Sequence, residues 1–315
     1  MRVRARFCQR LRRAALRLSH PGSTSVDGMT EHAARAFERV GPARPASPIV
    51  LSVPHAGRDY PADLLAAARA PKSVLKLLED RLADRLIWRA CAAGATAFVA
   101  RAPRAEIDLN RDEREIDPAL VDPPPGPGHF IPSVRARGGL GLIPSRIAGA
   151  GPIWRAPIPR AELERRIETI HRPYHEAIAA TLLSARERFG AAVLLDVHSM
   201  PPRDPQSGDP PIVVGDRHGT TSALPLRAAA LTTAQAFGYR AGANAPYAGG
   251  HVVARHGRPE HGVHALQLEI DRSLYLDAAL GAPGPGFNTV CGFVAALVAA
   301  LEATLFGEAP AIAAE

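Results

Sequence analysis

The chain has 315 residues, of which 46% are hydrophobic and 22% charged, and this composition excludes the disordered and fibrous classes of protein. Its length suits one large α/β domain or two smaller ones. The longest apolar run, Val290 to Leu301, is shorter than the roughly 18 to 20 residues of a membrane span, contains Gly292 and precedes Glu302. We therefore expect a soluble protein without a membrane partner.

The net charge of +7 is concentrated at the N-terminus. Residues 1–28 hold seven arginines and one acid, Asp27, which amounts to +6 and leaves +1 for the rest of the chain. We interpret residues 1–40 as a basic, disordered leader, and Met29 is an alternative start of the protein. A nucleic-acid tether is a further alternative that we favour less, so no nucleic-acid partner is expected. Residues 41–310 are predicted to form a single α/β domain.

Two features indicate a cytoplasmic protein. The leader lacks the apolar stretch of about 7 to 15 residues that a secretory signal requires. The three cysteines, Cys8, Cys91 and Cys291, lie far apart without CxxC spacing, which favours free thiols in a reducing compartment.

In chain order, apolar runs rich in β-formers alternate with helical patterns. The runs predict five strands, at 48–53, 95–100, 191–197, 211–215 and 265–270. The helical patterns predict helices at 62–70, 73–93, 161–190, 223–237 and 288–305, with a kink at Pro173. The runs do not alternate with polar residues, which is typical of strands buried on both faces. This order predicts an α/β sandwich.

Residues 118–160 interrupt this order. The segment is rich in glycine and proline, and it has no clear periodicity. Connections this long are uncommon in compact domains unless they form a lid or a binding loop. We expect an active-site loop, and a loosely packed insertion is the alternative.

Polar residues follow each predicted strand. They include His55 and Arg58, then Arg104 and Asp108, then Asp196 and His198, then Asp216 and His218, and finally Glu269 and Asp271. Ligands of open α/β sheets bind beyond the carboxyl ends of the strands, so we expect all these residues at one edge of the sheet. Two histidines with a carboxylate are a ligand set for catalytic zinc, although each histidine could instead have a structural role.

Several motifs resemble those of the N-formylglutamate amidohydrolase family over roughly residues 48–305. They are "SVPHAGRDYP", "EDRLADRL", "GATAFVARAPRAEIDLNRDEREIDP", "LLDVHSMP", "NAPYAGGHVVARHG" and "HALQLEIDRSLY". The resemblance implies a zinc-carboxypeptidase-like (phosphorylase/hydrolase-like) fold, a mixed β-sheet flanked by helices. It also implies hydrolysis of N-formyl-L-glutamate to formate and L-glutamate, a step of histidine degradation.

The resemblance also implies a zinc site. It assigns His55 and His198 as ligands, but Arg58 stands where carboxypeptidase-like enzymes have a glutamate ligand. Asp80 is our candidate for the third ligand and Asp84 is its competitor, because a helix would put both on one face. Either aspartate could instead pair with a neighbouring arginine on the surface.

By the same resemblance, Glu269 is the expected general base, and a buried ion pair with an arginine is the alternative. An N-acyl glutamate carries two carboxylates, which guanidinium groups bind in a bidentate manner. The candidate substrate-binding residues are Asn110, Arg111, Arg104, Arg255, His251 and Tyr247. The arginines could equally be surface charges, and Asp108 could cap a turn. His171 and His175 share one helix face, where core or supporting roles are favoured over metal binding.

These features together predict a zinc-dependent amidohydrolase that acts on a small N-acyl amino acid. A deacylase or carboxypeptidase-like hydrolase of another N-acyl amino acid is the nearest alternative. A non-catalytic metal- or ligand-binding protein of the same fold is an alternative of a different class. The pattern leaves the metal's identity and the oligomeric state open.

Overall fold

The computed structural model describes residues 36–307 of the chain. All of these residues belong to one compact unit. The expectations about the arginine-rich segment, Met29 as a start and Cys8 therefore lie outside the described residues. Within the described part, Cys91 and Cys291 are free thiols, as expected.

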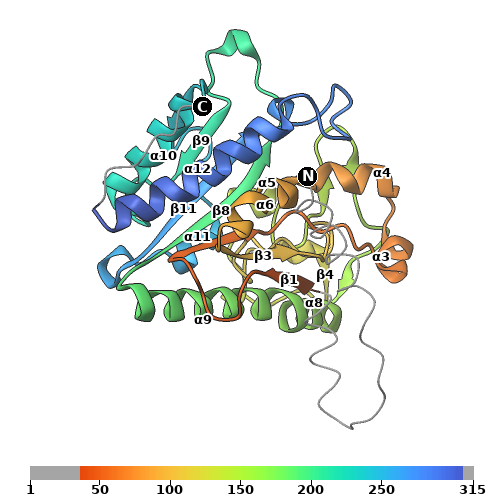
Figure 1. Ribbon diagram of the computed structural model, residues 1–315. Coiled ribbons are helices and arrows are strands. Elements are labelled where there is room, and N and C mark those ends of the chain that lie inside the picture. The colour runs from red at the N-terminus through yellow and green to blue at the C-terminus, as the bar shows by residue number, and fades with distance from the viewer. Residues whose placement is uncertain (1–35, 308–315) are drawn as a thin grey trace, which may run out of the picture. The chain divides into compact units, whose positions relative to one another are not determined.

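A seven-stranded sheet forms the centre of this unit (Figure 1). In spatial order its strands are β1 (Phe37–Val40), β3 (Thr96–Ala100), β2 (Ile49–Val53), β8 (Ala192–Met200), β11 (Val263–Asp271), β9 (Ile212–Gly215) and β10 (Ala241–Ala243). All five predicted strands are confirmed. The leader boundary at residue 40 is wrong, because β1 pairs with β3 and the Phe37 ring packs 5.8 Å from that of Phe98.

The sheet is mixed, as the resemblance implies. Strands β3, β2, β8 and β11 are parallel, whereas β9 runs antiparallel to β11. The expectation that every strand ends at the same edge is therefore wrong for β9, and Asp216 binds Arg227 instead. Only eleven residues, 201–211, connect β8 to β9, and parallel strands need a longer crossover that usually contains a helix.

Helices cover both faces of the sheet (Figure 1). Helices α8 (Arg160–Arg166), α9 (Arg172–Phe189) and α11 (His251–His256) lie on one face, and α5 (Ala83–Leu86), α6 (Trp88–Ala92), α10 (Leu224–Ala236) and α12 (Phe287–Leu305) lie on the other. Neighbouring strand residues pack on opposite faces: Leu194 belongs to the α9 side of the core and Leu195 to the α12 side. The predicted layering of the α/β sandwich is confirmed.

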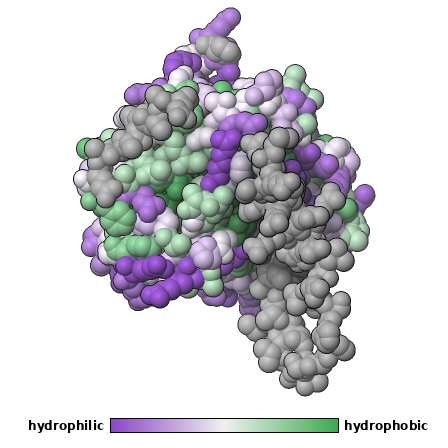
Figure 2. All heavy atoms as spheres, in the orientation of Figure 1, coloured by the Kyte–Doolittle hydropathy of each residue, from purple (hydrophilic) through white to green (hydrophobic). Residues whose placement is uncertain are grey.

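Helix α12 is the one helix in the described part that is long and apolar enough to cross a membrane. Its inner side is buried, with Phe293, Leu297 and Leu301 fully enclosed in the core on this face of the sheet. Apolar residues also gather along its outer side in Figure 2. The packing of its inner side makes it a core element of this unit.

Two predicted helices are interrupted. The one expected at 73–93 is broken into α4 (Lys72–Leu75), a 3₁₀ turn (Lys76–Leu78), α5 and α6. Between the turn and α5, Glu79 is extended and Leu82 adopts a left-handed conformation with φ 60°. The one expected at 161–190 is α8, a π-helical turn (Ile167–His171) and α9, and this turn lies just before Pro173. Proline cannot donate a backbone hydrogen bond, which favours an interruption there.

The remaining elements are short. They are α3 (Ala62–Ala67), β4 (Val121–Asp122), α7 (Val134–Arg137), β5 (Arg146–Ile147), β6 (Gly151–Pro152), β7 (Ile158–Pro159) and five 3₁₀ turns (Lys76–Leu78, Pro118–Leu120, Pro205–Ser207, Pro259–His261 and Arg272–Leu274). Residues 118–160 thus contain small elements, and they contribute several side chains to the pocket described next.

Candidate active site

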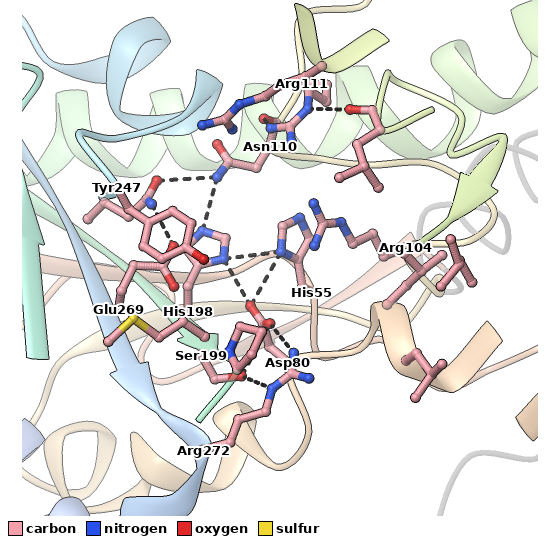
Figure 3. A pocket seen from close by; sticks show the side chains of 18 of the residues that line it. His55, Asp80, Arg104, Asn110, Arg111, His198, Ser199, Tyr247, Glu269 and Arg272 are labelled. Carbon is pink, nitrogen blue, oxygen red and sulfur yellow. Dashed lines mark hydrogen bonds and ion pairs between the residues drawn. The ribbon is translucent and has the colours of Figure 1, made fainter. Parts of the chain in front are cut away.

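A cavity of about 580 Å³ lies at the carboxyl ends of β2, β8 and β11 (Figure 3). Polar and charged side chains converge in it: His55, Asp80, Arg104, Asn110, Arg111, Arg135, His198, Ser199, Tyr247, Gln267, Glu269 and Arg272. Apolar residues line the rest of its wall, including Leu77, Leu78, Leu140 and Ile147. Its position is the one that the parallel strands predict.

The register of β8 and β11 explains how two buried strands present polar groups. Glu269 lies opposite His198, and Gln267 lies opposite Asp196. Side chains two positions apart point to the same face of a strand, so these four form one polar patch on the α9 side. Val197 and Leu268, between them, belong to the core on the α12 side.

Three side chains meet at one point. The Nδ1 atoms of His55 and His198 are 3.1 Å apart, and Asp80 Oδ2 lies 3.3 Å and 2.9 Å from them respectively (Figure 3). All three residues are at least 97% buried. Two nitrogens and one carboxylate oxygen could hold a metal ion at this point, and this is a ligand set that zinc uses.

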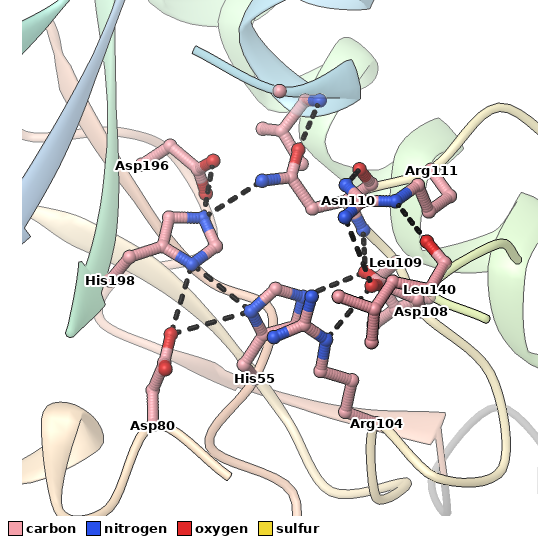
Figure 4. Close-up of polar contacts among 12 residues, drawn as sticks. His55, Asp80, Arg104, Asp108, Leu109, Asn110, Arg111, Leu140, Asp196 and His198 are labelled. Atoms are coloured by element: carbon pink, nitrogen blue, oxygen red, sulfur yellow. Dashed lines mark hydrogen bonds and ion pairs between the residues drawn. The ribbon is translucent and has the colours of Figure 1, made fainter. Parts of the chain in front are cut away.

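The outer nitrogen of each histidine contacts another carboxylate (Figure 4). His55 Nε2 lies 2.7 Å from Asp108, and His198 Nε2 lies 2.8 Å from Asp196. An ionised carboxylate only accepts hydrogen bonds, so both Nε2 atoms carry hydrogen. The Nδ1 lone pairs then face each other and Asp80, an arrangement that a cation would stabilise. Metal-binding histidines usually have such a partner on the other nitrogen.

The electrostatics also favour positive charge here. Burial disfavours an ionised Asp80, but the imidazoles of His198 and His55 outweigh it when they are protonated, and they hold the pKa of Asp80 well below its usual value. Burial likewise opposes a charged His198, yet the carboxylate of Asp196, with that of Asp80, raises the pKa of His198 well above its usual value. The site therefore attracts a cation, whether a proton or a metal ion.

Glu269 lies beside this triad. Its Oε1 accepts a hydrogen bond of 2.8 Å from Gln267, and it is 7% exposed. Burial raises the pKa of Glu269 to about 7, with the negative charges of Asp80 and Asp196 adding to the effect and His198 opposing it. A carboxyl group with such a pKa can both accept and donate a proton near neutral pH.

Asn110 and the two predicted arginines of this loop line the pocket. Arg104 donates to Asp108 at 2.8 Å and is therefore also linked to His55. The Arg111 guanidinium donates to the carbonyls of Leu140 and Asn110, so it largely supports the wall.

The Asn110 amide joins two walls of the pocket. Its Nδ2 lies 3.1 Å from His198 Nε2 and donates to Gln267 at 3.3 Å, while its Oδ1 accepts from the Val252 backbone. Tyr247 also lines the pocket.

Three candidates lie elsewhere. Arg255 is on the exposed side of α11, and neither it nor His251 lines the pocket, so the structure does not support their assignment to substrate. Asp84 pairs with Arg58, whereas Asp80 pairs with Arg272 and joins the two histidines. The helix that would have put both aspartates on one face is interrupted at this point.

Sequence reasoning missed several pocket residues. Gln267 lies two positions before Glu269 in the same strand. It could have been predicted, because every second side chain of a strand points to the same face. Asp108 and Asp196 lie behind the two histidines of the pocket. Both were visible as strand-end acids, but their contacts with His55 and His198 were not predicted. Arg135 and Arg272 carry no local signal that separates them from surface arginines.

Comparisons with known proteins identify the family of the chain. The model of the N-formylglutamate amidohydrolase family matches residues 47–276. N-formylglutamate deformylases of Pseudomonas aeruginosa and Pseudomonas putida are 32% and 31% identical to the chain, and each match covers 73% of this chain and 82% of the relative.

Solved structures give the same result. The N-formylglutamate amidohydrolase of Ralstonia eutropha superimposes with a TM-score of 0.80 at 33% identity, covering 87% of this chain and 99% of the other. A protein of Agrobacterium tumefaciens, at 19% identity and a TM-score of 0.56, covers 88% of this chain and 98% of its own and shares the fold. Since the family model covers most of the chain and the relatives exceed 30% identity, the chain belongs to the N-formylglutamate amidohydrolase family.

Proposed function

We propose that this protein is a metal-dependent amidohydrolase that converts N-formyl-L-glutamate to formate and L-glutamate. The observation that supports this proposal most directly is that His55, Asp80 and His198 converge beside Glu269 in one pocket, within a chain of this family. The two imidazoles, each backed by a carboxylate, fit a zinc ion. A cytoplasmic location and a role in histidine degradation stay predictions.

A zinc ion at these ligands would supply Lewis-acid chemistry, making a water molecule acidic near neutral pH and polarising an acyl oxygen. Glu269 accepts the proton of the attacking water and then delivers it to the leaving nitrogen. Asp108 and Asp196 keep hydrogen on the outer nitrogens of the histidines, so that their Nδ1 lone pairs stay directed inward.

Arginines at the pocket would bind the two substrate carboxylates. Arg104 faces the triad, and its guanidinium interacts with the charges of Asp108, Asp80 and Glu269. Arg135 lines the pocket from the exposed side, and its side chain makes no hydrogen bond or ion pair within residues 36–307, so its guanidinium donors are available to a ligand. Guanidinium groups suit carboxylates because of their planar pairs of donors.

A larger N-acyl amino acid is the second candidate substrate. The cavity of about 580 Å³ lies within the range of roughly 300–1,000 Å³ for small-molecule sites, and Leu77, Leu140 and Ile147 form an apolar part of its wall. An acyl group longer than formyl could pack against these side chains. This observation favours testing substrates that differ in the acyl group.

The test is release of formate or acetate by the full chain from N-formyl-L-glutamate, N-formyl-L-aspartate and N-acetyl-L-glutamate, each with zinc or with a chelator. We expect zinc-dependent turnover that is fastest with N-formyl-L-glutamate. Preference for the acetyl substrate would retain the mechanism and change the substrate. Zinc binding without turnover of any of the three would instead support a non-catalytic binding protein.

A further inference from the structure

Four histidines cluster between α9 and α11, outside the pocket. His171 and His175 come from the π-helical turn and α9, and His251 and His256 are the first and last residues of α11. The ring centroid of His171 lies 4.5 Å from that of His175 and 5.8 Å from that of His251, and those of His175 and His251 are 5.2 Å apart. Three imidazoles on one tetrahedral ion, with metal–nitrogen bonds of about 2.0–2.1 Å, would have centroids about 5 Å apart.

Hydrogen bonds assign the tautomers of the first two rings. His171 Nε2 lies 2.8 Å from the Arg111 carbonyl oxygen, and His175 Nε2 lies 3.0 Å from that of Leu109. A carbonyl only accepts, so both Nε2 atoms carry hydrogen and both Nδ1 atoms offer a lone pair. Donation of the outer N–H to a backbone carbonyl is the usual arrangement of a metal-binding histidine.

Two nitrogens in the cluster lack partners. His171 Nδ1 and His251 Nε2 are buried and make no hydrogen bond within the described part of the chain. His171 is fully buried, and buried polar atoms usually have a partner because leaving one unsatisfied costs about 1–3 kcal/mol. One potential ligand atom from each of His171, His175 and His251 lies within 4.8 Å of the other two.

The third potential ligand atom, His175 Nδ1, already takes part in a hydrogen bond. His175 Nδ1 lies 3.0 Å from His256 Nε2 and accepts its hydrogen. A metal ion would replace that hydrogen bond by a coordinate bond. Burial lowers the pKa of His171, His175 and His251, so these imidazoles are neutral and need not lose a proton to bind a cation.

We propose that His171, His175 and His251 form a second metal site, for a divalent ion that prefers imidazole, such as Zn²⁺. The ion would tie α9 to α11. It would also fix the two histidine N–H groups on the carbonyls of Leu109 and Arg111, and these two residues flank Asn110 in the pocket. This site is separate from the one proposed for catalysis and does not depend on it.

The experiment counts zinc per chain in the full protein, loaded with Zn²⁺, freed of excess ion and measured by elemental mass spectrometry. We expect two equivalents in the wild type, one in His251→Ala and one in His198→Ala. His261→Ala, which removes an exposed histidine, is the matched control and should retain two. His171→Phe, which keeps the volume of the ring, is an independent second variant should His251→Ala not fold.

The outcomes separate the two sites. Zinc content that is unchanged from wild type in folded His251→Ala or His171→Phe would overturn this proposal without touching the active-site ion. A single equivalent that persists in His198→Ala and disappears in His251→Ala would support this site and contradict the catalytic one. The proposal of this second site would also be overturned if His251→Ala and His171→Phe both retained two equivalents of zinc while His261→Ala lost zinc.

Discussion

The chemistry of the pocket depends on which nitrogen of each histidine carries a proton. Asp108 and Asp196 decide this for His55 and His198, because a carboxylate on Nε2 leaves the Nδ1 lone pair free. Both acids are fully buried. They are therefore positioning residues, and they would act on a metal ion through the histidines.

Replacement of these acids should weaken metal binding. In Asp108→Asn or Asp196→Asn the amide can no longer hold the proton on Nε2 as strongly, and we expect about 10–100-fold lower zinc affinity. Competition with a chromophoric chelator measures this. The exposed Asp204→Asn is the control. Wild-type affinity in both buried variants would contradict the assignment of their role.

Glu269→Gln tests the general base. The amide has the shape of the carboxylate but cannot accept and return a proton, so kcat should fall about 10²–10⁴-fold while zinc content is unchanged. Glu260→Gln, at an exposed position, is the matched control and should keep full activity. A loss of less than tenfold in Glu269→Gln would mean that another group moves the proton.

The raised pKa of Glu269 predicts how activity depends on pH. Burial raises this pKa to about 7, and only the ionised form accepts a proton. A bound cation favours the ionised form. Hence kcat/KM should fall about tenfold per pH unit below a midpoint at or below about 7. Initial rates across pH measure this limb, and an equally steep limb in the residual activity of Glu269→Gln would assign it to another group.

The backbone before α11 lies unusually close to two side chains of the pocket, those of Gln267 and Asn110. Gly250 precedes α11 and donates to Gln267 at 2.7 Å, and the Asn110 side chain lies directly against it. A Cβ atom at Gly250 would be 2.3 Å from Asn110 Oδ1, which no real contact allows. Gly250 thus serves packing around Asn110, whereas Gly249 has a φ of 115° and lies against Val253.

Gly250→Ala should displace Asn110 and destabilise the fold. Overpacking typically costs about 1–3 kcal/mol, and we expect that loss together with reduced kcat/KM. Gly281→Ala is the matched control, since a Cβ there has no atom within 4 Å. Urea unfolding measures the difference. Equal stability of the two variants would show that Asn110 can move without cost.

Over the whole described unit, the triad joins distant segments. His55 follows β2, Asp80 lies before α5, and His198 is in β8, 118 residues after Asp80. An ion held by all three would bind the folded chain and not the unfolded one. Such binding stabilises the native state by mass action.

Removal of metal should therefore lower the melting temperature. At a hundred times the dissociation constant, the ion contributes about 2.7 kcal/mol, or roughly 5 °C for a unit of this size. Calorimetry with zinc and with chelator measures this shift. In His198→Ala the part of the shift due to the triad should vanish, and an undiminished shift in that variant would place the stabilising ion elsewhere.

Local pattern alone determined much of this protein. Apolar runs predicted five strands of the sheet, because burial on both faces selects such runs wherever the strand lies. His55, His198 and Glu269 were predicted at strand ends, and the family motifs carried their roles. These inferences need only neighbouring residues and their order.

Tertiary structure decided the rest. The direction of β9, the position of Asp80 beside the two histidines and the pairing of His55 with Asp108 each depend on contacts between segments far apart in the chain. The histidine cluster between α9 and α11 likewise joins residues 171 and 251. No local pattern encodes such contacts, because they exist only once the sheet and its helices have packed.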